Sequence, residues 1–198
     1  MGLRERKKQQ TRMSIIAIAD EKFRTNGFDD TSIEEIADLA NVSAGTVYNY
    51  FPTKVEILIA AILERSGGFV ETSNLNLATL PAEPAAAVKK VIGQIFKMLD
   101  DYDRDLMRRA YASALDQSGA ASADYSRIDH VFEGMVNAVI SRFAETGVIS
   151  TDPGLVSRAA FNLGNGEFNN YLTGKHRTMQ AALRAANKQI DLLFSGVK

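Results

Sequence analysis

Proline placement is the sequence feature that most restricts the fold of this 198-residue chain. Its four prolines are Pro52, Pro81, Pro84 and Pro153, which leaves three long stretches without any proline. Because proline breaks helix interiors, this distribution suits a helical protein whose prolines mark helix boundaries. The sequence also lacks sustained alternation of β-branched residues, and no Asn-Gly or Asp-Gly hairpin joins two such runs. The sequence therefore predicts an all-α fold.

Composition removes several classes of site. The chain has no cysteine and only two histidines, so disulfides, thiolate zinc sites, cysteine nucleophiles and histidine-rich metal sites are excluded. We expect no metal, no cofactor and no catalytic residue, because no acid–base or nucleophile pairing can be assembled from the motifs. No apolar run approaches the roughly 20 residues that span a bilayer, and the basic N-terminus is not a signal peptide. We therefore expect no membrane partner and a cytoplasmic protein.

Hydrophobic periodicity predicts about nine helices. The first is expected from near Gln9 to Asn26. Thr31 and Glu34 have the spacing of a capping box, in which the Thr31 hydroxyl caps the second helix. Ser43 is expected to cap the third helix.

The block from Thr31 to Lys54, TSIEEIADLANVSAGTVYNYFPTK, is the most informative part of the sequence. Its two short predicted helices, Ile33–Ala40 and Ser43–Phe51, have the spacing of a helix-turn-helix. Val47 is expected to point inward and anchor the second helix, which leaves an outward surface of hydroxyls, an amide and two tyrosines without charge. Such a surface suits a DNA major groove, where these groups meet phosphates and base edges. The alternative is an ordinary pair of core helices with tyrosines at their rim.

This block resembles the DNA-binding domain of the TetR family of bacterial transcriptional regulators, with a dense likeness from about Thr11 to Leu63. The resemblance implies a three-helix DNA-binding domain in residues 1–52 and a helical ligand-binding and dimerisation domain in residues 53–198. It implies a sequence-specific transcriptional regulator, most simply a homodimeric repressor. A small-molecule effector would release it from a palindromic operator in double-stranded DNA.

The family's DNA contacts can be carried over residue by residue. Asn49 would reach a base edge, Tyr48 and Tyr50 would contact phosphates, and Lys54 would contact a phosphate at the start of the fourth helix. The implied DNA-binding residues are Thr31, Ser32, Ser43, Ala44, Gly45, Thr46, Tyr48, Asn49, Tyr50 and Lys54.

Positive charge is absent from the predicted recognition helix. No lysine or arginine occurs from Thr25 through Thr53, so no arginine can read guanine there. We expect phosphate contacts and DNA shape to carry much of the binding. The cations precede the first core residues, and two interpretations of this basic arm stay open: a disordered, solubilising tail or a DNA-binding arm. Its charged residues are Arg4, Arg6, Lys7, Lys8 and Arg12, with Glu5 as the one acid.

The C-terminal region is less informative. The resemblance implies a cavity for a small, largely apolar molecule, and plain core packing is the alternative for each residue that could line it. A 4-3-4-3 stripe near the C-terminus predicts the dimer seam. The candidate ligand contacts are Tyr102, Tyr111, Phe132, Asn165 and Phe168, and the stripe consists of Met179, Leu183, Ala186, Ile190 and Leu193.

Two other functions remain possible at this point. One is a DNA-binding regulator that responds to no ligand, which a helical body without a cavity would favour. The other is a small helical enzyme or carrier with the same architecture, which would require a convergent acid–base pair.

Overall fold

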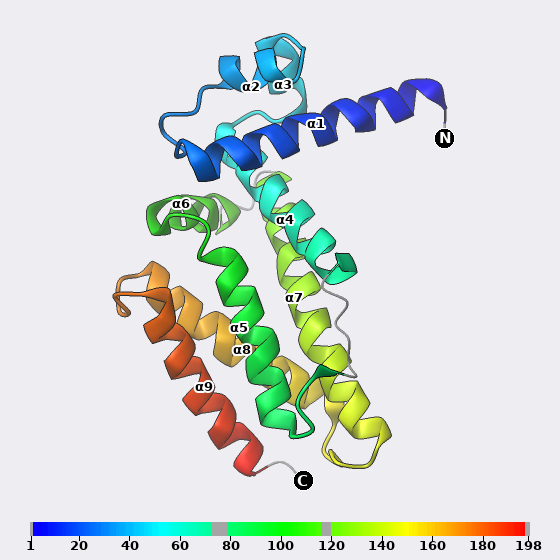
Figure 1. Cartoon of the computed structure of the whole chain (residues 1–198), viewed down its shortest axis with the longest axis vertical. Coiled ribbons are helices and arrows are strands. Elements are labelled where there is room, and N and C mark those ends of the chain that lie inside the picture. Colours follow the sequence, from blue (N-terminus) through cyan, green and yellow to red (C-terminus); the bar gives the residue numbers. More distant parts are fainter. Residues whose placement is uncertain (1, 73–78, 116–119, 197–198) are drawn as a thin grey trace. The chain divides into compact units, whose positions relative to one another are not determined.

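The computed structural model describes residues 2–72, 79–115 and 120–196 (Figure 1). Within these ranges the chain forms nine α-helices and no strand, which confirms the predicted all-α fold. No described helix combines the length and the hydrophobicity that crossing a bilayer requires. The helices are α1 (Leu3–Thr25), α2 (Ile33–Leu39), α3 (Ala44–Tyr50), α4 (Lys54–Thr72), α5 (Pro84–Leu99), α6 (Arg104–Leu115), α7 (Ala120–Glu145), α8 (Pro153–Leu172) and α9 (Met179–Ser195).

The chain divides into two compact units, and neither is one continuous segment. The first consists of Met1–Ser66 and Leu106–Ile128, and the second of Gly67–Asp105 and Asp129–Lys198. Helices α4, α6 and α7 each run through a boundary between the units. The boundary after residue 52 that the sequence suggests stays a prediction.

Helix α1 supplies much of the core of the first unit. Ile15, Ile16, Ala19 and Phe23 are buried at helical spacing along its C-terminal half. The helix begins at Leu3, six residues before the predicted start at Gln9. Periodicity could not reveal this extension because its residues are almost all polar, although arginine, lysine and glutamine favour helix.

The N-terminus of α2 corrects the predicted capping box by one residue. Ser32 is the capping residue, and its hydroxyl oxygen accepts a hydrogen bond from the Glu35 amide at 2.9 Å. Thr31 is completely buried instead, and its hydroxyl donates to the carbonyl of Gly27 at 2.8 Å. The Thr31 side chain therefore fastens the loop between α1 and α2 rather than the helix itself.

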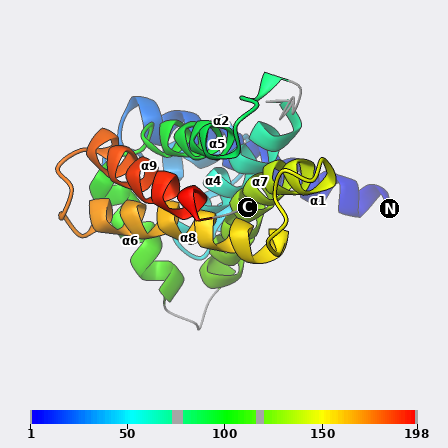
Figure 2. The ribbon, with the colours of Figure 1, turned by 90° about the horizontal axis from the view of Figure 1, so that it is seen from below.

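In the second unit, α9 packs on α5 and α8 (Figure 2). Gly164 of α8 lies so close to α5 that a Cβ at this position would come within 3.3 Å of the Ile92 side chain. On α9, Met179, Ala186 and Ile190 are buried. The three helices α5, α8 and α9 therefore pack against one another.

A buried carboxylate links α8 to α9. Glu167 accepts hydrogen bonds from Asn170 at 3.0 Å and from Gln189 of α9 at 2.5 Å. Its other neighbour is His176 in the turn between the helices, at 2.5 Å. Burial raises the pKa of the Glu167 carboxyl, but the hydrogen bonds from Asn170, His176 and Gln189 outweigh it and hold the pKa below its usual 4.5.

Candidate nucleic-acid interface

The turn between α2 and α3 depends on one residue in the left-handed region. Asn41 has a φ of 54°, a conformation that asparagine tolerates better than most residues other than glycine. The following amide of Val42 donates to the Ala37 carbonyl at 3.0 Å. The chain therefore reverses within a few residues and starts α3 directly, as a helix-turn-helix requires.

Helix α3 has one buried side and one exposed side, as predicted from the sequence. Val47 is fully buried, and Phe51 directly after the helix is 3% exposed. Tyr48 is 49% exposed. Its ring therefore gives up much of the apolar burial that a tyrosine in the core would provide. The other residues predicted to face DNA from this segment are exposed or half-buried: Ser43, Ala44, Gly45, Thr46, Asn49 and Tyr50.

Ser43 caps α3, which confirms the predicted start of this helix. Its hydroxyl oxygen lies 3.1 Å from the Thr46 amide and 2.9 Å from the Thr46 hydroxyl. A hydroxyl can donate one hydrogen bond and accept two, so this pair keeps capacity for a further partner such as a phosphate. The first turn of α3 thus presents two oriented hydroxyls on an exposed surface.

Thr31 and Ser32 were both expected to contact DNA, but only one of them is exposed. Thr31 is completely buried, so it cannot reach a phosphate in this structure, and that expectation is corrected. The neighbouring Ser32 is exposed. The family likeness implied a phosphate contact for both hydroxyl residues, whereas only the capping residue Ser32 lies at the surface.

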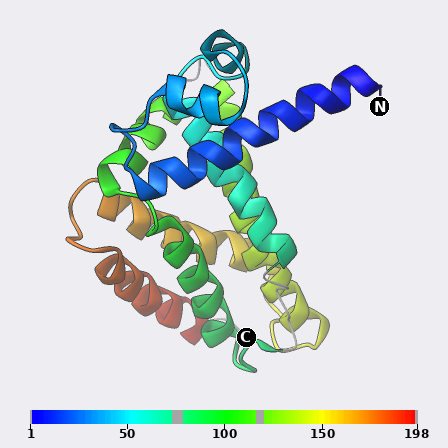
Figure 3. The same cartoon turned by 45° about the horizontal axis from the view of Figure 1, so that its top comes forward.

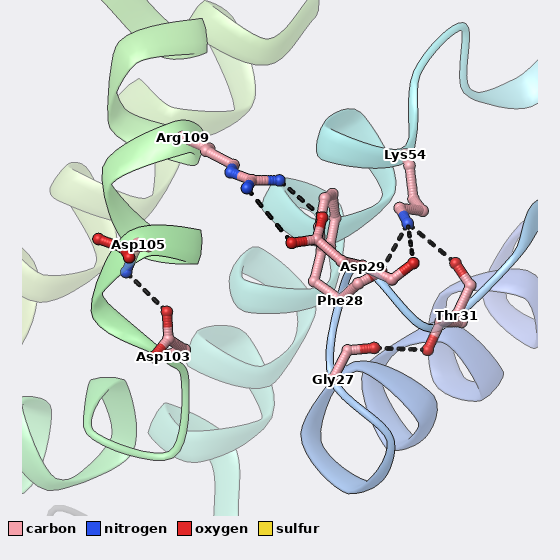
Figure 4. A network of polar contacts seen from close by, with 8 residues as sticks. All are labelled: Gly27, Phe28, Asp29, Thr31, Lys54, Asp103, Asp105 and Arg109. Carbon is pink, nitrogen blue, oxygen red and sulfur yellow. Dashed lines mark hydrogen bonds and ion pairs between the residues drawn. The ribbon is translucent and has the colours of Figure 1, made fainter.

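Lys54 also has an unexpected role, because its ammonium group is held by backbone carbonyls (Figure 4). It donates to Phe28 at 2.5 Å, to Thr31 at 2.9 Å and to Asp29 at 3.5 Å. The same nitrogen lies 4.3 Å from the centre of the Phe28 ring, a cation–π contact. Lys54 thereby ties the start of α4 to the loop between α1 and α2.

Arg109 of α6 contacts the same loop from a distant part of the sequence. Its guanidinium forms a two-pronged ion pair with Asp29, at 2.7 and 3.3 Å, and lies 5.9 Å from the Phe28 ring centre (Figure 4). Sequence reasoning missed this contact. It also missed the hydrogen bonds of Lys54 to the backbone carbonyls of the loop between α1 and α2, which we call the Lys54 clamp. No local signal encodes either, because one joins residues 80 apart and the other residues 23 to 26 apart.

The predicted ligand and dimer residues fall in both units. Tyr102, Phe132 and Phe168 are buried in the second unit, and Asn165 is half-buried there. Tyr111 belongs to the first unit, where it packs edge-on against Tyr125 at 5.7 Å. Within the described residues, no group of three histidine, aspartate or glutamate side chains could hold a metal ion.

The predicted dimer stripe serves mainly inside the chain. Met179, Ala186 and Ile190 are at most 4% exposed, and Leu183 and Leu193 are half-buried. The Leu183 side chain lies against α5 beside Gly93. A 4-3-4-3 spacing predicts an apolar seam but cannot tell a partner helix in the same chain from one in a second copy.

Comparison with known proteins accounts for the helix-turn-helix. The sequence profile described as bacterial regulatory proteins, tetR family, matches residues 15–61, which span the buried half of α1 through the first turns of α4. Residues 15–61 therefore form a domain of the TetR family of bacterial regulatory proteins.

Relatives extend this likeness over nearly the full length of the chain. It is 26% identical to a fatty acid metabolism regulator protein of Bacillus subtilis, over 97% of this chain and 98% of the relative. Two solved structures share the fold. Thermus thermophilus FadR in complex with lauroyl-CoA is 22% identical and superposes with a TM-score of 0.70. The alignment covers 93% of this chain and 94% of the FadR chain. Bacillus subtilis FadR with stearoyl-CoA has a TM-score of 0.63 at 24% identity, covering 94% and 99%.

The Lys54 clamp predicts a loss of stability on its removal. Lys54→Met leaves the carbonyls of Phe28 and Thr31 without their charged donor, so the free energy of unfolding should fall by about 1–3 kcal/mol. Urea denaturation followed by circular dichroism measures this change. The control is Lys22→Met, which removes only a surface ion pair with Glu35 and should change stability by less than about 1 kcal/mol. If Lys54→Met kept wild-type stability but bound DNA more weakly, Lys54 would instead be assigned to a phosphate contact.

Proposed function

We propose that this TetR-family regulator is a homodimeric repressor that binds a palindromic operator through α3 and leaves it when a small molecule binds. The observation that carries the proposal is the outward face of α3. Tyr48 and Asn49 are exposed while Val47, directly before them, is completely buried. Such a helix offers polar groups to a groove from a fixed base. A cytoplasmic location follows from this proposed role.

The outward residues divide into two roles. Ser43, Thr46, Tyr48 and Tyr50 carry hydroxyls that suit phosphate oxygens, which position the protein without reading sequence. Asn49 carries the one side-chain amide of α3, and an amide can pair with an adenine edge. Ala44 and Gly45 are the two smallest residues of α3 and allow the helix to approach the DNA closely. Ala44 can also contact a thymine methyl group.

These roles predict different effects for two substitutions. Asn49→Ala should blur the preference at one base position, with a loss of about 1–3 kcal/mol of discrimination there. Tyr48→Phe should weaken binding to all sequences to a similar extent because it removes a phosphate contact. Selection of binding sites from random DNA, followed by affinity measurements on the selected duplex, tests both. A Tyr48→Phe protein with a new preferred sequence and full affinity would contradict the assignment.

Dimerisation requires a surface other than the buried stripe. Two large apolar side chains on the helices of the proposed dimer seam are solvent-exposed in the single chain: Leu192 of α9 is 75% exposed and Leu155 of α8 is 62% exposed. A two-fold dimer uses the same patch on both copies, so one such leucine contributes twice to the interface. We infer that the exposed side of α8 and α9 forms the seam. The two copies of α3 would then enter major grooves about 34–36 Å apart, or at another spacing that the same symmetry imposes.

This seam predicts monomers when its exposed leucine becomes charged. Leu192→Glu should shift the protein from dimer to monomer in sedimentation velocity, with little change in the stability of the chain, because the side chain is already exposed. Leu115→Glu is the matched control, since Leu115 is 64% exposed on α6 in the other unit. If Leu192→Glu and Leu115→Glu dimerised equally well, the dimer interface would have to lie on another surface.

The effector we propose is a long-chain acyl thioester of coenzyme A. Supporting it are the full-length likeness to a fatty acid metabolism regulator and the acyl-CoA complexes of two proteins with this fold. The second unit also buries aromatic side chains suited to an acyl chain: Phe96 and Phe168 lie 6.1 Å apart, and Phe132 is buried as well. Binding there would reach the first unit through the continuous helices α4, α6 and α7.

Linkage makes this effector testable. If stearoyl-CoA releases the operator, then operator DNA must weaken stearoyl-CoA binding by the same factor. Calorimetric titration of stearoyl-CoA with and without the selected duplex measures that factor, with unacylated coenzyme A as the control for the headgroup. Equal affinity in both titrations would mean that the thioester binds without affecting DNA binding. No binding at all would remove this class of effector.

A further inference from the structure

The N-terminal half of α1 and helix α3 share one cleft. Its volume is ≈ 740 Å³, and three of its eight lining residues, Thr46, Asn49 and Tyr50, come from the recognition helix. The other five come from the first turns of α1, which project well beyond α2 and α3 (Figure 3). They are Arg4, Glu5, Lys7, Lys8 and Thr11.

The cations of this cleft lie along one side of α1. Arg4, Lys7, Lys8 and Thr11 follow the spacing i, i+3, i+4, i+7, which aligns side chains on one face of a helix. Within the described residues, none of the three cations forms an ion pair with the protein's own acids. Glu5 is the one acidic residue of the cleft, so its lining carries an excess of two positive charges.

Arg12, by contrast, is used inside the first unit. Its guanidinium lies 3.8 Å from Asp124 and 5.2 Å from the centre of the Phe51 ring. This contact fixes α1 beside the residue that ends α3. The cationic stripe of α1 is therefore held in register with the recognition helix rather than attached by a loose tail.

We propose that this cleft is a second DNA-binding surface, in which Arg4, Lys7 and Lys8 hold the sugar–phosphate backbone beside the groove occupied by α3. The inference rests on the proposed function and extends it. The recognition helix has hydroxyls and an amide but no cation, and α1 supplies the missing positive charge to the same cleft. Arg4 and Thr11 are about 10 Å apart along the helix axis, a length that spans about three phosphates of one strand.

The salt dependence of DNA binding tests this assignment. The full-length triple variant Arg4→Gln/Lys7→Gln/Lys8→Gln is compared with wild type on the duplex selected from random DNA and on a scrambled duplex of equal length. The negative slope of log affinity against log salt should become less steep by about 0.9 for each lost phosphate contact, or about 2.7 per chain. Between 50 and 200 mM salt this amounts to roughly a 40-fold smaller loss of affinity per chain. The sequence preference should not change.

Arg6→Gln provides the matched control. Arg6 lies on the same exposed part of α1 but outside the cleft, so its slope should stay close to that of wild type. A triple variant with the wild-type slope, or a slope changed equally by Arg6→Gln, would overturn the assignment. An altered preferred sequence in the triple variant would show base reading by the arm and would also overturn it. If selection from random DNA yields no duplex that wild type binds, the proposed function fails together with this inference, an outcome distinct from the others.

Discussion

Short helices cannot hold their shape without support, and this constraint governs the DNA-facing part of the molecule. Helices α2 and α3 have seven residues each, well under the roughly 12–15 that an isolated helix needs to persist in water. Their conformation therefore depends on capping and on burial. The hydroxyls of Ser32 and Ser43 each accept a hydrogen bond from an amide in the first turn of their helix, while Ile36 and Val47 are fully buried in the core of the first unit. The exposed residues of α3 can be polar because the buried ones hold the helix in place.

Local patterns in the sequence predicted this part of the fold well. Ser43 as a cap and Val47 as an anchor follow from short-range rules of helix termini and amphipathicity, and the structure has both. The same rules failed by one residue at Thr31, because two adjacent hydroxyl residues can both serve as a cap in sequence. The extension of α1 to Leu3 also escaped notice, since polar residues give no hydrophobic period.

Contacts between distant residues were beyond the reach of the sequence. Lys54 and the carbonyls of the loop between α1 and α2 meet only after α1 to α4 have packed, so no spacing rule could assign the ammonium group to them. On α9, a regular apolar stripe predicted a dimer seam, whereas Met179, Ala186 and Ile190 of this stripe are buried within the single chain, in a helix that packs on α5 and α8. Periodicity reports which side of a helix is buried and is silent about what buries it.

The discontinuity of the first unit has a consequence during protein synthesis. The helix-turn-helix lies within the first 66 residues, but its unit also needs Leu106–Ile128. Arg109, which pairs with Asp29, is made 80 residues later than its partner. Because chains emerge from the ribosome N-terminus first, the DNA-facing helices must wait for α6 and the start of α7 before their unit is complete. A nascent chain therefore finishes its DNA-reading part only after the first segment of the second unit, Gly67–Asp105, has already been synthesised.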